Sequence, residues 1–437
     1  MTGRPRASGH EVARLALPAL VALVAEPLFL LADAAVVGHL GTVPLAALGV
    51  ASAALSSAAG VLVFLAYGTT GSVARRLGAG RVREAVASGL DGVWLAVVLG
   101  VAVGAGLLVT ALPVAGAFGA GGAVTADAVT YLRVSAAGLP GMLVTMAATG
   151  VLRGLQDTRT PLLVALVGFT ANVALNVVLV YPGGLGIAGS ALGTVIAQTG
   201  LGVALVVVVL RRAGRVPLRP HPWRVLVAAR DGLPLFVRSV LLRAVLLVTT
   251  WVAASGDPVT LAAYQVSATV WTFGGFALDA LAVAAQALTG RALGAGDVAA
   301  ARSLTALVLR WGTLAGAALG ALVLALHGVL PVLFTADPAV RAALSAALVV
   351  LALRLPLMGW VGVLDGVLIG AGDGRWLAGA HAVLLLAYLP VALLVRQGDV
   401  SAGGLWWGFA VFMALRALLL GARARGDRWL VTGATHP

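Results

Sequence analysis

Four acidic residues lie within long apolar stretches of the sequence, where a charged side chain is costly. They are Glu26, Asp33, Asp279 and Asp365. Insertion scales put the cost of a charge at the centre of a membrane helix at about 2.5–3.5 kcal/mol. A carboxyl group in such a place faces a cavity, pairs with a cation or takes up a proton, because desolvation penalises its ionised form.

Asp33 is the candidate for proton exchange. It lies 19 residues after Arg14, no arginine is expected at its depth in the first half of the chain, and the residue 216 positions later is Thr249. An aspartate without a cationic partner favours protonation over a salt bridge, although a hydrogen bond to a neighbouring helix is the alternative. Glu26, two turns earlier and directly before Pro27, is either a second proton site or a partner of backbone groups that the proline leaves free.

Asp279 and Asp365 lie toward the cytoplasmic ends of their apolar stretches. Both are candidates for substrate binding. The alternative, favoured for Asp279, is a structural ion pair with an arginine of similar depth. The arginines that meet this condition are Arg238, Arg243 and Arg354.

Two amides add to this set of polar residues. Asn172 and Asn176 are four residues apart in one apolar stretch, so they lie on the same face of a helix. There they either bind a substrate or form hydrogen bonds to a neighbouring helix.

Residue types that the chain lacks exclude several other chemistries. All 29 basic residues are arginine, so the lysine of a GxxxxGK[ST] nucleotide loop is missing. There is no cysteine, and the six histidines are scattered without the spacing of a metal site. No GxSxG motif occurs, and the loops are too short for a catalytic domain. We therefore expect no enzyme, cofactor or metal site, so any active process draws on an ion gradient or the membrane potential.

The elements that must position these residues are membrane helices. Hydrophobic residues make up 61% of the chain and charged residues 10%, whereas a soluble domain is about half apolar and a quarter charged. A spanning helix needs about 20 apolar residues. Twelve stretches of about that length lie near residues 15–37, 45–71, 90–112, 125–151, 162–181, 187–210, 229–253, 260–288, 302–326, 340–369, 376–395 and 401–420.

The placement of arginine orients these helices. The two tails and the even-numbered loops hold most of the arginines, whereas the odd-numbered loops hold Arg341 and Arg396. Short loops rich in basic residues stay cytoplasmic, so both termini are expected on the cytoplasmic side of a bacterial inner membrane. A basic chain also suits nucleic acid, but here the arginines follow the loops between apolar stretches, so no nucleic-acid partner is expected.

An internal repeat appears at a single offset of 216 residues. Matched pairs include Leu17-Pro18 and Leu233-Pro234, Arg75 and Arg291, and Asp157 and Asp373. Each repeat holds six helices, so the second begins on the same side of the membrane as the first, which makes the repeat parallel. We predict an N-terminal lobe at 1–210, a cytoplasmic linker at 211–230 and a C-terminal lobe at 231–437.

Two stretches carry a glycine at every fourth position. Small residues then line one face of a helix, and we expect close helix packing there. The residues are Gly312, Gly316 and Gly320, and Gly362, Gly366 and Gly370.

With these residues in view, the chain resembles the MATE family of multidrug and toxic compound extrusion proteins, in its DinF-like branch. The stretch Ala32–Gly41 (ADAAVVGHLG) is similar to the DTAVVGHLG motif of the branch's first helix. The stretches that begin at Ala277 and at Leu364 are similar to its helix-8 and helix-10 motifs, the latter reading LDGVLIGAG. The stretches occur in order, and the twelve-helix organisation covers nearly the whole chain.

The resemblance implies an all-α integral membrane fold with two six-helix lobes arranged as a V, and alternating access driven by H⁺ or Na⁺. It implies that Asp33 is the protonated switch and that the first helix bends near Pro18. The branch's helix-5 motif NxxLD supplies an amide and a second carboxylate that face this switch. We align the motif at Asn176, so that the acid position falls on Val180 and the carboxylate is missing; Glu26 is a candidate substitute.

We therefore expect an antiporter that exports small organic compounds, cationic or amphiphilic in character. Gln286 stands where the branch usually carries a glutamate, and the loss of acids favours H⁺ over Na⁺, which prefers several oxygen ligands. The chain is expected to act as a monomer. Two alternatives stay open: a flippase for lipid-linked sugars of the wider superfamily, and a membrane protein that transports nothing.

Overall fold

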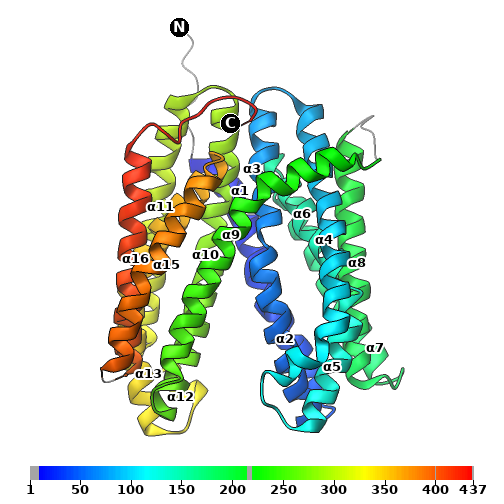
Figure 1. The fold of residues 1–437 in the computed structure, drawn as a ribbon, viewed down its shortest axis with the longest axis vertical. Helices are drawn as coiled ribbons and strands as arrows, with labels where there is room; N and C mark the ends of the chain where they lie inside the picture. The colour runs from blue at the N-terminus through cyan, green and yellow to red at the C-terminus, as the bar shows by residue number, and fades with distance from the viewer. Residues whose placement is uncertain (1–8, 214–218, 399, 436–437) are drawn as a thin grey trace. The chain divides into compact units, whose positions relative to one another are not determined.

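The computed structural model describes residues 9–213, 219–398 and 400–435, apart from the side chains of Glu26 and Ala213. Within these ranges the structure consists of the helices α1 to α16 and contains no strand (Figure 1). Ten helical segments are long and apolar enough to cross a membrane, and two further pairs of helices pass the same test together. With each pair counted as one span, the count agrees with the predicted twelve.

The two paired spans are bent at equivalent positions of the repeat. α5 (Gly122–Ala136) and α6 (Leu139–Gly154) meet at 54°, and α13 (Pro338–Ala352) and α14 (Leu355–Gly370) meet at 50°. In both pairs a proline occupies the first turn of the second helix, where its missing N–H costs no hydrogen bond. Hydropathy alone predicted each pair as one continuous stretch, because the break changes the backbone and leaves the apolar composition unchanged.

The chain divides into two compact units, which we call the N-terminal unit (Val21–Phe236) and the C-terminal unit (Val237–Pro437 with the chain up to Leu20). The N-terminal unit holds most of α1 (Gly9–Gly38), together with α5 and α6. It also holds α2 (Thr42–Leu62), α3 (Phe64–Gly78), α4 (Val82–Gly116), α7 (Arg159–Val180) and α8 (Gly186–Ala213). The C-terminal unit holds most of α9 (Pro222–Ala253), together with α13 and α14. It also holds α10 (Pro258–Gly294), α11 (Val298–Leu326), α12 (Leu330–Phe334), α15 (Gly374–Gln397) and α16 (Ala402–Arg425). In both units the helix that follows the bend, α6 or α14, packs against several neighbours.

Two helices change unit along their length, which differs from the predicted lobe boundaries. α1 passes into the N-terminal unit after Leu20, and α9 passes into the C-terminal unit after Phe236. Pro18 and its repeat counterpart Pro234 each lie two residues before these points. The boundary between the units therefore falls within continuous helices.

Much of the predicted linker is also helical. α8 continues to Ala213, and α9 begins at Pro222, a residue that suits the first helical turn. Residues 214–218 lie outside the described residues. The prolines and arginines of this stretch suggested a loop, but the residues from 222 onward are largely apolar and contain no further proline before Pro234.

Glycine allows the close packing around α14. A Cβ atom on Gly316 would lie 2.2 Å from the Leu355 carbonyl oxygen, and one on Gly366 would lie 2.4 Å from the Ala282 carbonyl oxygen. Backbone atoms cannot rotate away as a side chain can, so these positions exclude a larger residue. Close packing at the glycine stretches is thus confirmed, except at Gly362, where a Cβ atom would meet open space.

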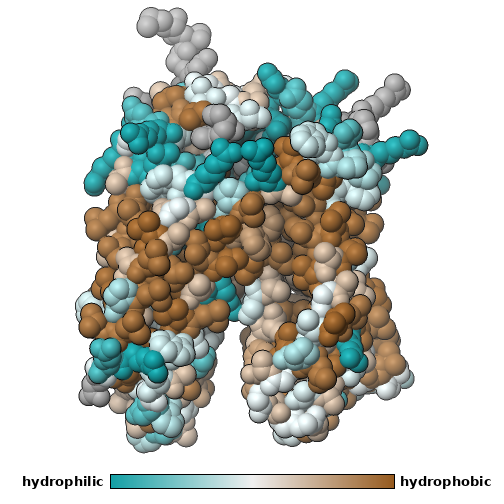
Figure 2. Space-filling view, in the orientation of Figure 1, coloured by the Kyte–Doolittle hydropathy of each residue, from teal (hydrophilic) through white to brown (hydrophobic). Residues whose placement is uncertain are grey.

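The surface fits a lipid environment. Apolar residues cover the middle of the helices, and polar residues gather toward their ends (Figure 2). Large apolar side chains are well exposed, among them Val109 at 81% and Leu333 at 74%. Soluble proteins rarely expose apolar surface of this extent.

Candidate functional site

Asp33 lies on α1 inside the N-terminal unit, with 5% of its surface exposed. Its Oδ1 accepts a hydrogen bond from the Nδ2 of Asn176 on α7. Asn176 Nδ2 also donates to Asn172 Oδ1 at 3.0 Å, and Asn172 Nδ2 donates to Thr194 Oγ1 on α8 at 3.2 Å. A chain of hydrogen bonds therefore connects the carboxyl group on α1 to α7 and α8.

Asp33 has neutral partners. The ion pairs found between described residues of the N-terminal unit join Arg81 to Glu84 and Arg212 to Asp157, close to the helix ends, and none of them includes Asp33. An amide N–H can donate to a carboxylate and equally to the carbonyl oxygen of a carboxylic acid. The surroundings of Asp33 therefore accept both of its protonation states.

A cavity of about 280 Å³ lies beside this carboxyl group, and we call it the Asp33 cavity. α1, α2, α5, α6, α7 and α8 all contribute to its wall, so it belongs entirely to the N-terminal unit. Its polar side chains include Asp33, Tyr131, Asn172, Thr194 and Gln198.

The remaining wall of the Asp33 cavity includes aromatic rings and flexible side chains. Phe29 and Phe169 stack with their ring centroids 5.1 Å apart, and Met142 and Met146 line the same space. Aromatic rings and adaptable methionine side chains accept apolar molecules of varied shape. With one carboxyl group in an otherwise neutral wall, the cavity suits an amphiphilic cation.

The structure corrects the alignment of the helix-5 motif. Asn176 contacts Asp33, whereas Val180 is buried one turn further along α7 and does not line the Asp33 cavity. Read from Asn172, the pattern NxxLD matches the residues NVALN at 172–176, so an amide occupies the acid position. Two asparagines four residues apart made both alignments possible in the sequence, and the contact with Asp33 decides between them.

Two other predicted residues of the first helix have different outcomes. The side chain of Glu26 lies outside the described residues, so its role stays a prediction. Pro18 lies within α1, which continues as a helix on both sides of it. At the other end of this helix, the hydroxyl of Tyr181 donates to the Val36 carbonyl oxygen at 2.8 Å and ties α7 to α1.

Asp365 is buried on α14 between two arginines. Arg238 on α9 donates from Nε to its Oδ1 at 3.2 Å, and Arg416 on α16 donates from Nη2 to its Oδ2 at 2.9 Å. The pair with Arg238 is the structural alternative that the sequence left open for Asp365, and Arg416 was not anticipated. Both carboxylate oxygens are therefore engaged by guanidinium groups.

Asp279 is half-buried on α10 and does not line the Asp33 cavity, so its predicted part in substrate binding stays a prediction.

The sequence did not reveal three aromatic residues that line the Asp33 cavity, namely Phe29, Tyr131 and Phe169. Aromatic residues are ordinary in membrane helices, and unlike an acid they give no signal of a site until their neighbours are known.

The chain belongs to the MATE family. The MatE family model matches residues 18–178 and again residues 234–394. The second segment begins 216 residues after the first, which is the offset of the sequence repeat. Protein DETOXIFICATION 44, chloroplastic, from Arabidopsis thaliana is 30% identical over 96% of this chain and 82% of its own length. DNA damage-inducible protein F from Escherichia coli is 30% identical over 93% of this chain and 90% of its own length.

Solved structures agree with this membership. A MOP superfamily transporter from Pyrococcus furiosus superposes with a TM-score of 0.86 at 21% identity, over 95% of this chain and 94% of its own. A Vibrio cholerae MATE transporter in its bent form superposes with a TM-score of 0.85 at 22% identity. The match covers 96% of this chain and 98% of the Vibrio cholerae chain. Identities this low support the fold, which is that of an all-α, multi-pass membrane transporter of the MATE family.

Proposed function

We propose that this transporter exports small organic cations and amphiphiles in exchange for protons, with Asp33 as the proton-carrying group. The observation that carries the proposal is a buried carboxyl group that faces a cavity and has only neutral hydrogen-bond partners among the described residues. A cation in the cavity favours the ionised form of Asp33, and a proton on Asp33 weakens the binding of that cation. Competition for one carboxyl group is the exchange mechanism.

The transport cycle follows from this competition. When the Asp33 cavity is open to the outside, Asp33 takes up a proton and the cation leaves. α1 then rearranges about Pro18, which supplies no N–H to the helix and lies three residues before Val21, where the N-terminal unit begins. Loss of the proton toward the cytoplasm prepares the cavity for the next cation.

The energy available is sufficient for export. Exchange of one proton for one monovalent cation moves no net charge, so the pH gradient drives it and supplies about 1.4 kcal/mol per pH unit. This free energy corresponds to an outward concentration ratio of about ten for each pH unit. One titrating carboxyl group is therefore enough for useful accumulation outside the cell.

The proposal assigns the other polar residues to distinct roles. Asn176 holds the carboxyl group of Asp33, and Asn172 holds Asn176 and also contacts the substrate from the cavity wall. An amide at position 176 supplies one oxygen where a carboxylate would supply two, which favours H⁺ over Na⁺. For Asp365, the two arginines favour a structural role over substrate binding.

The test is transport by the purified chain in proteoliposomes, in sodium-free buffer with an imposed pH gradient. The wild type is expected to accumulate a fluorescent organic cation such as ethidium, and Asp33→Asn is expected to lose the coupling to the pH gradient. Thr249→Val, at the repeat counterpart of Asp33, serves as the matched control and should transport normally. Full coupling in Asp33→Asn would remove Asp33 from the mechanism.

Proteoliposomes also separate the alternatives. A wild-type chain that moves no organic cation under any gradient, but translocates a lipid-linked sugar, would be a flippase. A chain that moves neither would contradict transport of both kinds.

A further inference from the structure

A second cavity, of about 120 Å³, lies in the N-terminal unit and is lined by α3, α4 and the first half of α9. We call it the α3–α9 cavity. It lies toward the end of α3 and the beginnings of α4 and α9, the side of the unit that the arginine pattern predicts to be cytoplasmic. The exchange proposed at Asp33 makes no use of this space.

Four charged side chains line the α3–α9 cavity, two of each sign. α3 contributes Arg76, α4 contributes Asp91, and α9 contributes Arg224 and Asp231. Asp91 interacts electrostatically with both arginines, and Arg76 interacts with Asp231 as well. The four charges sum to zero, so the wall complements a ligand that carries both signs of charge better than a simple anion or cation.

These opposite charges surround the cavity without direct contact. The ion pairs between described residues of the N-terminal unit, which are named above, include none of the four groups. Arg76 Nη1 donates instead to the carbonyl oxygen of Ser72 at 3.1 Å. A ligand with an anionic and a cationic group can form charge-assisted hydrogen bonds to both kinds of side chain at once.

The shared scaffold of the two repeats does not require these charges. The repeat counterparts of Arg76, Asp91 and Asp231 are Ala292, Leu307 and Leu15. All three counterparts are apolar and belong to the C-terminal unit. Since the same helices form with apolar residues at these positions, the charges point to binding rather than to packing.

The inner part of the wall is apolar. On α3, Phe64 and Leu65 lie about three turns before Arg76, and on α4, Leu95 lies about one turn after Asp91. The cavity therefore changes from charged to apolar along these two helices. A phospholipid changes in the same way from its headgroup to its acyl chains.

The size of the cavity restricts the ligand further. A cavity of about 150 Å³ holds one benzene molecule, whereas drug-sized ligands occupy pockets of about 300–1,000 Å³. The α3–α9 cavity thus suits a compact headgroup and is too small for an organic molecule of drug size.

We propose that the α3–α9 cavity binds the headgroup of phosphatidylethanolamine, a zwitterionic phospholipid. The phosphate pairs with Arg76 and Arg224, because guanidinium groups bind phosphate oxygens through two N–H donors. The ammonium group donates its hydrogen bonds to Asp91 and Asp231. The bound lipid thus joins the first half of α9 to α3 and α4, and its binding does not depend on whether the chain exports cations.

The test is native mass spectrometry of the delipidated full chain in detergent micelles, titrated with phospholipids that share the same dioleoyl chains. The first phosphatidylethanolamine is expected to bind at least about fivefold tighter than phosphatidylcholine, whose quaternary ammonium has no N–H to donate. Phosphatidylglycerol should also bind at least about fivefold more weakly, since it carries a phosphate but no cation for the two aspartates.

Substitutions separate the two halves of the site. Asp91→Asn is expected to weaken phosphatidylethanolamine binding about fivefold and to strengthen phosphatidylglycerol binding, because a repulsive carboxylate is removed. Arg224→Gln is expected to weaken the binding of both lipids. Arg230→Gln is the matched control, because Arg230 is exposed on the same helix and does not line the cavity. If Asp91→Asn does not fold, Asp231→Asn takes its place.

Glycerophosphoethanolamine, the headgroup without acyl chains, distinguishes a lipid from a free solute. The lipid is expected to bind at least about tenfold tighter, because its chains add apolar contacts. Equal affinity for the two would assign the site to a solute and overturn the proposal. Equal affinity of the wild type for the three phospholipids, or unchanged phosphatidylethanolamine binding in folded Asp91→Asn and Arg224→Gln, would overturn it as well.

Discussion

The two repeats place different chemistry at equivalent positions of the same helices. In the N-terminal unit, α1 and α7 bring Asp33 together with Asn172 and Asn176. In the C-terminal unit, the counterparts of Asp33 and Asn172 on α9 and α15 are Thr249 and Tyr388, whose hydroxyl groups lie 2.8 Å apart. The repeat thus preserves the meeting point of the two helices, but only the N-terminal unit has a titratable carboxyl group there.

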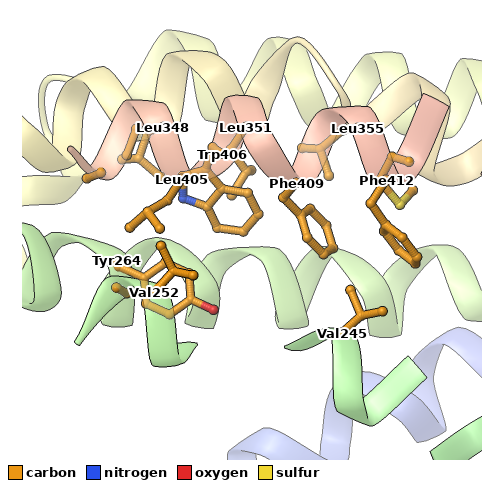
Figure 3. Packing of buried hydrophobic residues seen from close by; sticks show 14 of the residues in the cluster. Val245, Val252, Tyr264, Leu348, Leu351, Leu355, Leu405, Trp406, Phe409 and Phe412 are labelled. Carbon is orange, nitrogen blue, oxygen red and sulfur yellow. The ribbon is translucent and has the colours of Figure 1, made fainter. Parts of the chain in front are cut away.

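The difference continues in the packing around each point. Tyr388 contacts Phe409 and Phe412, with ring centroids 6.5 Å and 5.7 Å away, and these rings belong to the buried cluster in Figure 3. Asp33 instead borders a cavity of about 280 Å³. At this point the same fold encloses a cavity in one unit and packs aromatic rings together in the other.

The acids of the two units differ in the same way. Asp365 is fixed between Arg238 and Arg416, whereas Asp33 is held by an amide. A carboxylate between two arginines is stabilised in its ionised form, but one with neutral partners can change its charge during a cycle. The C-terminal acid is thus held in an ion-pair network, and this difference supports the proposal that the N-terminal acid is the exchanging one.

Breaking the C-terminal ion pairs is expected to have the largest effect on stability. Asp365→Asn leaves two buried guanidinium groups without their carboxylate, and the loss of one partner from a buried ion pair costs about 3–5 kcal/mol. Asp33→Asn keeps the shape of its side chain and removes no cationic partner, so it should unfold at or above the wild-type temperature. Thermal unfolding in detergent compares the two, and similar destabilisation by both would contradict the distinction between fixed and exchangeable acids.

The glycine contacts should be equally important in both units. A Cβ atom on Gly150 would lie 2.4 Å from the Ala66 carbonyl oxygen, and its counterpart Gly366 meets Ala282 at the same distance. Gly150→Ala and Gly366→Ala are each expected to destabilise the protein by about 1–3 kcal/mol through overpacking. Gly362→Ala, which adds a methyl group in open space, is the control. A neutral effect at either crowded position would mean that the shared scaffold is more adaptable than its contacts indicate.

Restoring the missing acid should change the coupling. Asn176→Asp places a second carboxyl group against Asp33, and two such groups at hydrogen-bond distance titrate as a coupled pair. The number of protons exchanged per cation should rise from about one to about two, which adds about 1.4 kcal/mol of driving force per pH unit. Reversal-potential measurements in proteoliposomes give this number, and an unchanged value would show that position 176 does not belong to the proton site.

The smallest effect is expected at the hydroxyl pair of the C-terminal unit. Tyr388→Phe removes the hydrogen bond to Thr249 but keeps the ring in its aromatic cluster, so the cost should be about 0.5–1.5 kcal/mol. Proton-coupled export should remain at the wild-type rate. A loss of coupling in this variant would place part of the proton path in the C-terminal unit.

Much of the scaffold could be predicted from composition and repetition. The twelve spans followed from apolar length, and the family match at residues 18–178 and 234–394 reproduces the offset found in the sequence. The bends before Leu139 and Leu355 could not be predicted in the same way, since they interrupt the backbone without changing hydropathy.

The site was predictable only where a residue type is unusual for its surroundings. Asp33 stands out because an acid in an apolar stretch is costly, whereas Tyr131 in the same cavity does not stand out. The alignment of Asn176 was wrong because either of two asparagines could fill the motif, and only a contact between residues 143 positions apart distinguishes them. Likewise, no local pattern connects Arg416 with Asp365.

The most direct test of the account is the release of protons on substrate binding, without any membrane gradient. Tetraphenylphosphonium is added to the purified protein in weakly buffered solution, and a pH-indicator dye reports the protons released per cation bound. Competition for Asp33 predicts that the wild type releases up to about one proton per cation at a pH where Asp33 is protonated, and that Asp33→Asn releases none. Equal release by both proteins, or cation binding by the wild type without release at any pH, would contradict the exchange mechanism.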